Sequence, residues 1–425
     1  MNEEYDFHFP KNFLWGASTS AHQVEGDNHN QWTQWEQKNA VRLAQEAPQK
    51  FPFLPEKLRQ EATGPQNYIS GKACDHFRRY REDFDLMKSL GMNAYRFSIE
   101  WSRIEPEKGV FDAEALRHYC EMIRELHTRN IEPLITLWHW TVPCWFFAAG
   151  DFTAENSAKL FARYTEYVLR GFQKEKLALK LFITLNEPEV YVANSYLRGE
   201  WPPQQRNFFA ARKVRQNLLA AHHAAYEMIK SMVPEAQVGI AHALAYMEPY
   251  KHTFLNRMAA KIAEYFWNES FLRHTVHTED FLGLNYYFRT LISWHGTKHD
   301  ATRPRSDLNW ELHPKGIEFL LRLLKKYEKP IYITENGLAD YDDSRRGEYI
   351  EKVLAALARA IQAGVPVRGY LHWSLLDNFE WDKGFWARFG LIEIDHTKNL
   401  ERRVRPSALK YAEIIRKGGV SGQQF

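Results

Sequence analysis

Two glutamates in short polar motifs are the strongest candidates for chemistry in this sequence. Glu187 stands in TLNEP (184–188) and Glu335 in ITENG (333–337), each beside an asparagine at the end of an apolar run. Either glutamate alone would more often be a loop anion near a helix N-terminus. As a facing pair, one carboxyl can protonate a leaving oxygen while the other attacks an anomeric carbon or activates water. The pair therefore predicts glycoside hydrolysis.

Polar and aromatic residues near the ends of other apolar runs fit a sugar ligand. Amide, imidazole and carboxylate groups can hydrogen-bond hydroxyls, and indole rings can stack on the C–H face of a hexose. Singly, His139 and Trp140 are more typical of a core, so the prediction depends on the coincidence of the whole set. Its members are Gln23, His139, Trp140, Asn186, Asn285, Tyr287, Glu380 and Trp381, with Trp373 as the stacking platform.

Arg96 lies inside the apolar run NAYRFS, where an isolated buried cation would be costly. We therefore expect Arg96 to form an ion pair with Glu335 and to keep that carboxylate ionised and oriented. We also expect Tyr287 to donate a hydrogen bond to the same carboxylate.

The elements that position these residues are short β-type runs alternating with amphipathic stretches such as 112–129 and 156–173. This alternation predicts an α/β fold with parallel strands, and eight runs predict a single-domain (β/α)8 barrel over residues 1–425. In such a barrel the working residues lie where strands end. The runs are 13–18, 93–99, 131–138, 180–185, 237–242, 280–287, 329–334 and 367–376.

Two segments depart from this regular alternation. Residues 28–72, rich in Gln, Pro and charge, are interpreted as a long loop on the catalytic face. The basic ERRVR (401–405), beside an expected C-terminal helix, is interpreted as a solvated surface rather than a phosphate site.

Composition excludes several classes of protein. The net charge of +3 over 425 residues favours neither nucleic acid nor an anionic membrane as a partner. No targeting segment is visible in MNEEYDFHFP, and no apolar run reaches the ~18 residues of a membrane span. The three cysteines lack disulfide or metal spacing, so we expect reduced thiols in a cytoplasm. His139, His222 and His223 also lack ligand spacing, so no metal and no cofactor are predicted.

Taken together, these motifs resemble glycoside hydrolase family one, whose typical member is a retaining β-glucosidase on a (β/α)8 barrel. The resemblance runs nearly end to end and in the family's order. It is carried by FLWGASTSAHQVEG (13–26), YRFSIEWSRIEP (95–106), LWHWTVP (137–143), TLNEP, DFLGLNYY (280–287), ITENG and WSLLDNFEW (373–381).

The resemblance implies a role for each matching residue. Glu187 would be the general acid/base and Glu335 the nucleophile, supported by Arg96, Asn285 and Tyr287. Trp310 would be a wall of the aglycone site and Trp373 the stacking floor. The implied glycone binders are Gln23, His139, Trp140, Asn186, Glu380 and Trp381.

Residue types also separate branches of the family. Members that act on 6-phosphorylated sugars carry Ser in place of Glu380, so a neutral glycone is favoured. The thioglucosidase branch carries Gln in place of Glu187. The segment between the fifth and sixth runs is shorter than is usual, and we expect it to open one side of the barrel or the aglycone cleft.

The sequence thus predicts an exo-acting β-glycosidase, foremost a β-glucosidase with β-galactosidase or β-fucosidase activity, acting on a small-molecule β-glycoside or oligosaccharide. Two alternatives stay open: a carbohydrate-binding barrel without turnover, and a transglycosidase. The glycone, the aglycone and the oligomeric state are not determined by the residues.

Overall fold

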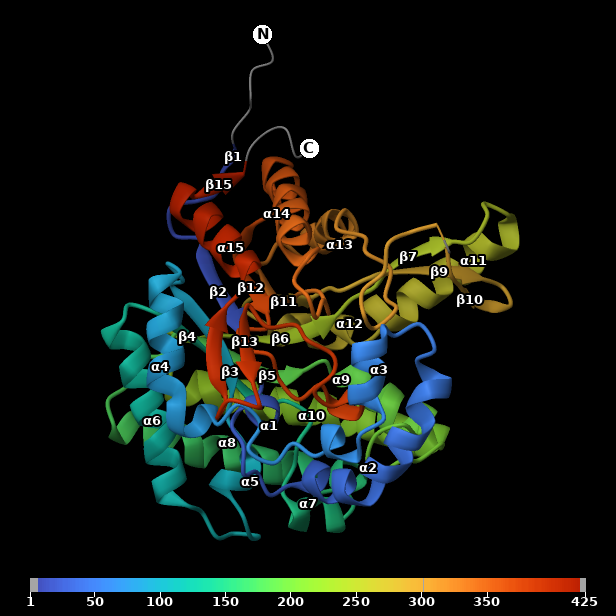
Figure 1. The fold of residues 1–425 in the computed structure, drawn as a ribbon. Coiled ribbons are helices and arrows are strands. Elements are labelled where there is room, and N and C mark those ends of the chain that lie inside the picture. The colour runs from blue at the N-terminus through green and yellow to red at the C-terminus, as the bar shows by residue number, and fades with distance from the viewer. Residues whose placement is uncertain (1–6, 301, 421–425) are drawn as a thin grey trace.

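Eight parallel strands close into a barrel in a computed structural model that describes residues 7–300 and 302–420. The N-terminal residues 1–6, where the sequence predicts no targeting segment, lie outside the described residues. The barrel order is β11-β12-β2-β3-β4-β5-β6-β8 (Figure 1). The strands are β2 (Leu14–Ser18), β3 (Ala94–Ser98), β4 (Glu132–Trp138), β5 (Leu181–Asn186), β6 (Gln237–Ala243), β8 (Leu282–Asn285), β11 (Ile331–Asn336) and β12 (Val367–Trp373). All eight predicted runs are confirmed as the barrel strands.

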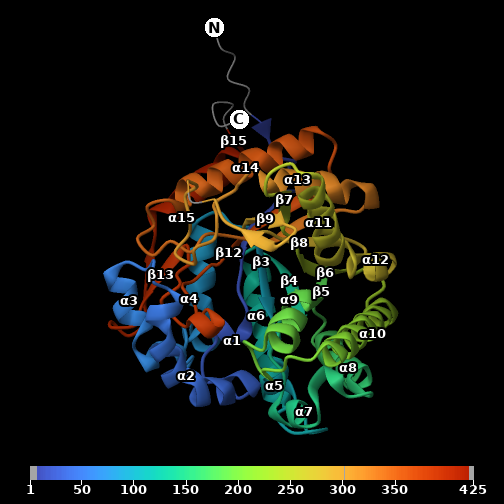
Figure 2. The same ribbon diagram turned by 90° about the vertical axis from the view of Figure 1, so that its right-hand side faces the viewer.

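Helices surround the barrel, and the two amphipathic stretches quoted from the sequence are confirmed as α6 and α8 (Figure 2). Their apolar stripes repeat every three or four residues because one helix face packs on the strands. The main helices are α4 (His76–Ser89), α6 (Ala113–Thr128), α8 (Ser157–Lys174), α10 (Phe208–Met232), α13 (Gly316–Leu324), α14 (Arg346–Gln362) and α15 (Pro406–Lys417). Shorter ones follow strand ends: α1 (Ala21–Val24), α5 (Trp101–Ile104), α7 (Cys144–Ala148) and α9 (Pro188–Val192).

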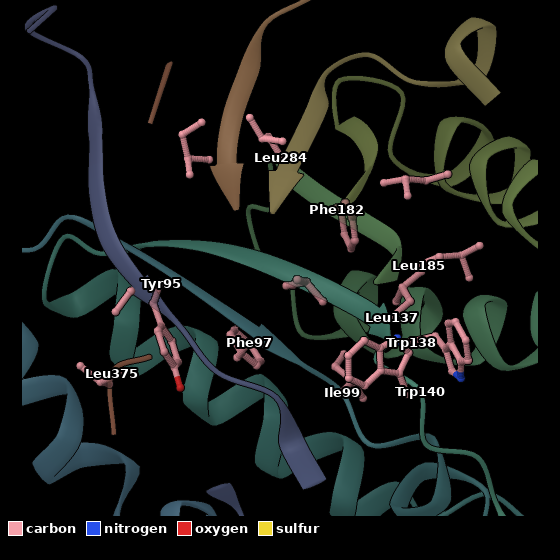
Figure 3. Close-up of a cluster of buried hydrophobic side chains, with 14 of the residues drawn as sticks. Tyr95, Phe97, Ile99, Leu137, Trp138, Trp140, Phe182, Leu185, Leu284 and Leu375 are labelled. Carbon is pink, nitrogen blue, oxygen red and sulfur yellow. The ribbon is translucent and has the colours of Figure 1, made fainter. Parts of the chain in front are cut away.

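Strand β3 shows how alternation divides the barrel between core and site. Ala94 and Arg96 face the interior, where Ala94 packs in a small apolar cluster, while Tyr95 and Phe97 pack in the outer core. Figure 3 shows Tyr95 and Phe97 with Leu137, Trp138 and other buried side chains of this outer core. The inward positions nearest the strand ends are thereby left to polar residues.

The segment 28–72 contains more helix than its composition indicates. It forms α2 (Gln31–Lys50), α3 (Glu56–Ala62) and a 3-10 turn (Pro65–Tyr68), so its interpretation as a loop is wrong. Asn30 caps α2: its side-chain oxygen accepts a hydrogen bond from the Thr33 amide, and the Asn30 amide donates one to the Thr33 hydroxyl. Trp32 and Trp35 are buried and anchor this helix. The apolar pattern of the helix is hard to recognise in the sequence because polar residues such as Glu36 are buried beside them.

The short region between β6 and β8 leaves the barrel closed, because Ala241 pairs with Gly283 and Ala243 with Asn285. The expected opening of one side of the barrel is therefore wrong. The region holds β7 (Tyr246–Pro249), α11 (Phe254–Glu264), a π-helical turn (Tyr265–Glu269), α12 (Leu272–Thr275) and a 3-10 turn (Val276–Thr278). After β8 come β9 (Arg289–Ser293) and β10 (Gly296–Lys298), which complete a small sheet of order β10-β9-β7.

The prediction of a solvated surface for the basic segment 401–405 is correct for Glu401 and Arg403, whose side chains are exposed, and wrong for Arg402 and Arg405. Strand β14 (Glu401–Val404) pairs with β13 (Ile392–Asp395). A second two-stranded sheet joins β1 (Phe7–His8) to β15 (Gly419–Val420). The buried Arg402 contacts Asp83 through Nε at 2.9 Å and Nη2 at 3.1 Å, and Arg405 forms a second buried ion pair with Asp377 at 2.6 Å. The prediction failed for these two arginines because their partners lie more than 300 residues away for Arg402 and in a separate loop for Arg405.

We expect Asp83→Asn to destabilise the protein by about 3–5 kcal/mol, because it removes the buried counter-ion that Arg402 hydrogen-bonds and leaves only the half-exposed Glu82 at 4.0 Å. Although burial disfavours the charged form of Asp83, hydrogen bonds from His76 and Arg402 lower the pKa of its carboxyl below the usual range. Chemical denaturation measures the effect. The exposed pair Glu348–Lys352 is the control, and its removal should cost less than about 1 kcal/mol. Equal effects of the two substitutions would contradict the prediction.

Candidate active site

A cavity of about 490 Å³ lies where the barrel strands end. Ten of the thirteen residues singled out from the sequence line it. They are His139, Trp140, Glu187, Asn285, Tyr287, Trp310, Glu335, Trp373, Glu380 and Trp381. The other three, Gln23, Arg96 and Asn186, are buried behind the wall and contact the lining residues through hydrogen bonds.

Glu335, at the end of β11, is held on both carboxylate oxygens. Its Oε1 accepts from the Arg96 guanidinium of β3, and its Oε2 accepts from the Tyr287 hydroxyl at 2.7 Å. The predicted ion pair and hydrogen bond are therefore confirmed. Arg96 is itself fixed by Thr136, whose hydroxyl accepts from Nε at 3.1 Å. Both oxygens of the Glu335 carboxylate are thus fixed in direction by donors from β3 and from the loop after β8.

Glu187 follows the last residue of β5 and has a different environment. Its Oε1 accepts from the Asn285 side-chain amide at 2.7 Å, and no cation contacts it within hydrogen-bond distance among the described residues. Burial, followed by the negative charge of Glu335, raises the pKa of Glu187 to about 8. Glu187 is therefore protonated at neutral pH.

The two glutamates are connected by a chain of side-chain hydrogen bonds. Asn186 Oδ1 accepts from Arg96 Nη2 at 2.6 Å and from Asn285 Nδ2 at 3.2 Å. Asn285 then donates to Glu187, and its own Oδ1 accepts from Thr334 at 2.6 Å. These contacts fix the orientation of both amides, because each nitrogen faces an acceptor and each oxygen a donor. This chain of hydrogen bonds fixes the positions of the two carboxyl groups relative to each other.

His139, at the end of β4, presents a free nitrogen. Burial, reinforced by the positive charge of Arg96, lowers the pKa of the imidazole well below its usual value, so the ring is neutral. The Asn186 side-chain amide donates to Nε2 at 3.0 Å, which places the ring proton on Nδ1. Nδ1 is buried and has no partner among the described residues. The Nδ1 proton is thus a buried donor without an acceptor in the described part of the chain.

Glu380 and the indoles of Trp140, Trp373 and Trp381 form another part of the wall. Gln23 donates to Glu380 Oε2 at 3.1 Å and to the Phe379 carbonyl at 2.9 Å. Burial and the nearby charge of Glu335 raise the pKa of Glu380 to about 8. The Trp140 and Trp381 rings lie 4.9 Å apart between centroids, and His139 stacks against Trp373 and Trp381.

Three of these residues adopt the left-handed backbone region although none is glycine. The φ angles are 42° for Glu187, 73° for Trp140 and 48° for Trp381. Such conformations cost roughly 1–3 kcal/mol each and persist only where the surroundings impose them. For Glu187, the backbone amide donates to the Ala241 carbonyl at 2.8 Å, which ties the residue to the neighbouring strand β6.

The structure adds cavity residues that sequence reasoning missed. Trp201 packs on Trp140 with 4.7 Å between ring centroids, and its indole nitrogen donates to Asp382 at 2.9 Å. Phe389 packs near Tyr287 and Trp310. These residues stand in loops rather than at strand ends, so only the unusual density of aromatic residues could have indicated them. An apolar side of the cavity is formed by Leu244, Ala245, Met247, Trp267, Phe288, Ile292 and Leu308.

Comparisons with known proteins agree with this geometry. The family model described as Glycosyl hydrolase family 1 matches residues 5–281 and 275–420. A curated "Beta-glucosidase A" of Thermotoga maritima is 30% identical over 97% of this chain and 98% of the relative. A "Beta-galactosidase" of Sulfolobus acidocaldarius is 31% identical over 97% of this chain and 96% of the relative.

Solved structures show the same similarity. A β-glycosidase from Pyrococcus horikoshii superposes with a TM-score of 0.85 at 38% identity, covering 98% of this chain and 96% of the other. A β-glucosidase from Thermotoga maritima in complex with glucoimidazole superposes with a TM-score of 0.84 at 29% identity, covering 97% of this chain and 100% of the other.

Proposed function

The chain belongs to glycosyl hydrolase family 1 and is a retaining β-glycosidase, and we propose that Glu335 and Glu187 carry out its two steps. The observation that supports this most is the contrast between the two carboxyl groups. Glu335 accepts hydrogen bonds from the Arg96 guanidinium and the Tyr287 hydroxyl, while burial and the Glu335 charge raise the pKa of Glu187 and keep it protonated. Carboxyl groups whose environments separate their pKa values divide the acid and nucleophile roles.

In the first step, a Glu335 oxygen attacks the anomeric carbon while Glu187 protonates the departing oxygen. Glu187 Oε1 accepts from Asn285, so the transferable proton is on Oε2. The glycosyl ester removes the negative charge of Glu335, and the pKa of Glu187 then falls. The ionised Glu187 takes a proton from a water molecule as the water oxygen attacks the anomeric carbon. The bond between that carbon and Glu335 breaks, which restores the carboxylate and releases the sugar with its β configuration retained.

We propose His139 and Glu380 as the groups that recognise the glycone hydroxyls, with Trp373 as the stacking surface and Trp310 as part of the aglycone wall. The unpartnered Nδ1 proton supports the role of His139. Gln23 and Asn186 lie behind the wall, so they act on a sugar chiefly by orienting Glu380 and His139. Relatives are named as β-glucosidases and β-galactosidases, and we propose neutral β-glucosides and β-galactosides as substrates.

A panel of nitrophenyl β-glucoside, β-galactoside, β-fucoside and β-mannoside tests this function, with the Glu335→Gln protein as background. Turnover above that background establishes the glycosidase and ranks its glycones. Sugar binding without turnover would favour the non-catalytic barrel instead. Product analysis at high acceptor concentration measures how far an acceptor sugar competes with water for the glycosyl ester, and so tests the transglycosidase alternative.

We expect kcat/KM to fall as the pH rises through about 8, because the first step needs a protonated Glu187 whose pKa lies there. The sign follows from the raised pKa, since the active acid form is lost on the alkaline side. Glu380 has a pKa raised to a similar value. The Glu187→Gln variant on an activated nitrophenyl substrate distinguishes the two groups. If Glu187 causes the alkaline fall in kcat/KM, the fall disappears in this variant; if Glu380 causes it, the fall persists.

We also propose a single catalytic domain over residues 1–425 and a cytoplasmic location. Cys74, Cys120 and Cys144 are free thiols, and the first two are buried, which supports a reducing compartment. Within residues 7–300 and 302–420, no helix combines the length and apolarity needed to cross a membrane.

A further inference from the structure

Helix α11 turns its apolar side away from the protein. Its buried residues, Asn256 and Ala260, face the small sheet β10-β9-β7, against which the helix packs through β7 and β9. The opposite side carries large apolar side chains at helical spacing. Their exposed fractions are 76% for Phe254, 54% for Leu255, 44% for Met258 and 52% for Ile262, and Phe266 in the following π-helical turn is 65% exposed.

The turn between β9 and β10 extends this surface. Trp294 is 59% exposed, and its backbone amide donates to the Asn256 side chain of α11 at 3.0 Å. Phe254, Leu255, Met258, Ile262, Phe266 and Trp294 are called the α11 surface below. In Figure 1, α11, β7, β9 and β10 extend together from one side of the barrel. A soluble domain normally buries such a stripe, so a contiguous exposed one marks an interaction site.

The α11 surface lies on and beside elements that also line the active-site cavity. The elements that carry it also contribute cavity residues: Met247 from β7, Trp267 from the π-helical turn, Ile292 from β9 and Thr297 from β10. Whatever covers the surface is therefore next to the cavity through which substrate enters.

Charge around the α11 surface selects among possible occupants. Lys251, Arg257, Lys261 and Lys298 are exposed, and none forms a salt bridge with a described residue. In a twofold dimer the same patch would meet itself and bring these cations together. An anionic lipid surface instead complements them. A helix with Phe, Leu and Ile on one side and Lys and Arg beside them is typical of helices that lie in the membrane interface.

We propose that the α11 surface docks this enzyme on an anionic lipid bilayer. The helix would lie parallel to the bilayer, with its apolar side chains among the acyl chains and its lysines and arginine at the headgroups. The sequence predicts no membrane partner because the net charge is small and no apolar run is long enough to span a bilayer. Docking at the bilayer surface requires neither feature. The placement suits glycosides with an apolar tail, an extension that rests on the proposed function.

Co-sedimentation of the full chain with vesicles tests the proposal, using phosphatidylcholine alone and phosphatidylcholine mixed with phosphatidylglycerol. We expect binding to the anionic vesicles that weakens with salt, and at least about tenfold weaker partition for Leu255→Gln/Met258→Gln/Ile262→Gln. The matched control Val41→Gln/Val110→Gln/Leu409→Gln changes three equally exposed apolar residues on other elements and should bind as the unchanged protein does. Arg257→Glu/Lys261→Glu should weaken binding to the anionic vesicles alone.

Absence of binding to both vesicle types would overturn the proposal, as would equal binding by the α11 and control variants. Sedimentation velocity without lipid tests whether a second copy of the chain occupies the surface instead. If the unchanged protein is a dimer, the α11 variant is a monomer and no vesicle binding occurs, the surface is a dimer interface and the proposal is overturned. Turnover of a soluble nitrophenyl glycoside is scored separately, and both triple variants should retain it because none of their positions lines the cavity. Failure of the proposed function would abolish that turnover and leave vesicle binding intact.

Discussion

The Glu335→Gln enzyme is expected to turn over every β-glycoside about four to six orders of magnitude more slowly than the unchanged enzyme. The amide retains the size of the carboxylate and a hydrogen-bonding oxygen, yet it cannot form the glycosyl ester. It also leaves the buried Arg96 without its anion. Because both chemical steps pass through the ester, the loss should be similar for good and poor leaving groups. Initial rates on a nitrophenyl and an alkyl glycoside of the same sugar measure it.

A smaller side chain at position 335 tests directly whether Glu335 is the nucleophile. Glu335→Ala leaves space on the face of the sugar from which the carboxylate attacks, and added azide can enter there. We expect azide to restore part of the rate on an activated substrate and to give the α-glycosyl azide, because only one displacement then occurs. A β-glycosyl azide from this variant, or full activity of Glu335→Gln, would exclude Glu335 as the nucleophile.

The Glu187→Gln substitution is expected to cost about 10²- to 10⁴-fold on substrates with poor leaving groups and far less in the first step on a nitrophenyl glycoside. Glutamine preserves the contact with Asn285 but has no proton to transfer. The steeper dependence on leaving-group pKa is the diagnostic measurement. Unchanged rates on an alkyl glycoside would show that another group supplies the proton.

Two controls accompany the Glu187 prediction. With Glu187→Ala, azide should intercept the glycosyl ester and give the β-glycosyl azide, the opposite anomer to that from Glu335→Ala. Thermal unfolding at neutral pH should show Glu187→Gln at least as stable as the unchanged protein. The reason is that folding raises the pKa of Glu187 to about 8, so the native carboxyl must take up a proton that the unfolded chain does not hold.

Much of the fold was predictable because its signals are local. Each barrel strand is a short apolar run, and each run identified in the sequence is a barrel strand in the structure. The helix α2 was missed because buried polar residues such as Gln31 and Glu36 interrupt its apolar pattern. A buried polar residue looks exposed in a sequence until its partners are known, as Glu36 does until His22 and Ser70 contact it.

The candidate site also contains residues that the sequence predicted and residues that it did not. Strand-end positions placed Glu187, Glu335 and most of the residues predicted to bind sugar around one cavity, since parallel strands of a barrel all end on the same side. Trp201 and Phe389 lie in loops whose paths depend on packing, and no local pattern marks them.

The sequence by itself determined the order of strands, the residues at their ends and the pair of glutamates, because a period of two and a break in hydrophobicity are properties of neighbouring residues. Only the tertiary structure decided the charge states and the orientations. The pKa of Glu187 depends on burial and on the charge of Glu335, and the orientation of Asn285 on Thr334, all remote along the chain. Likewise, the apolar stripe of α11 is evident in the sequence, but whether it faces the core or the solvent depends on the sheet against which the helix packs.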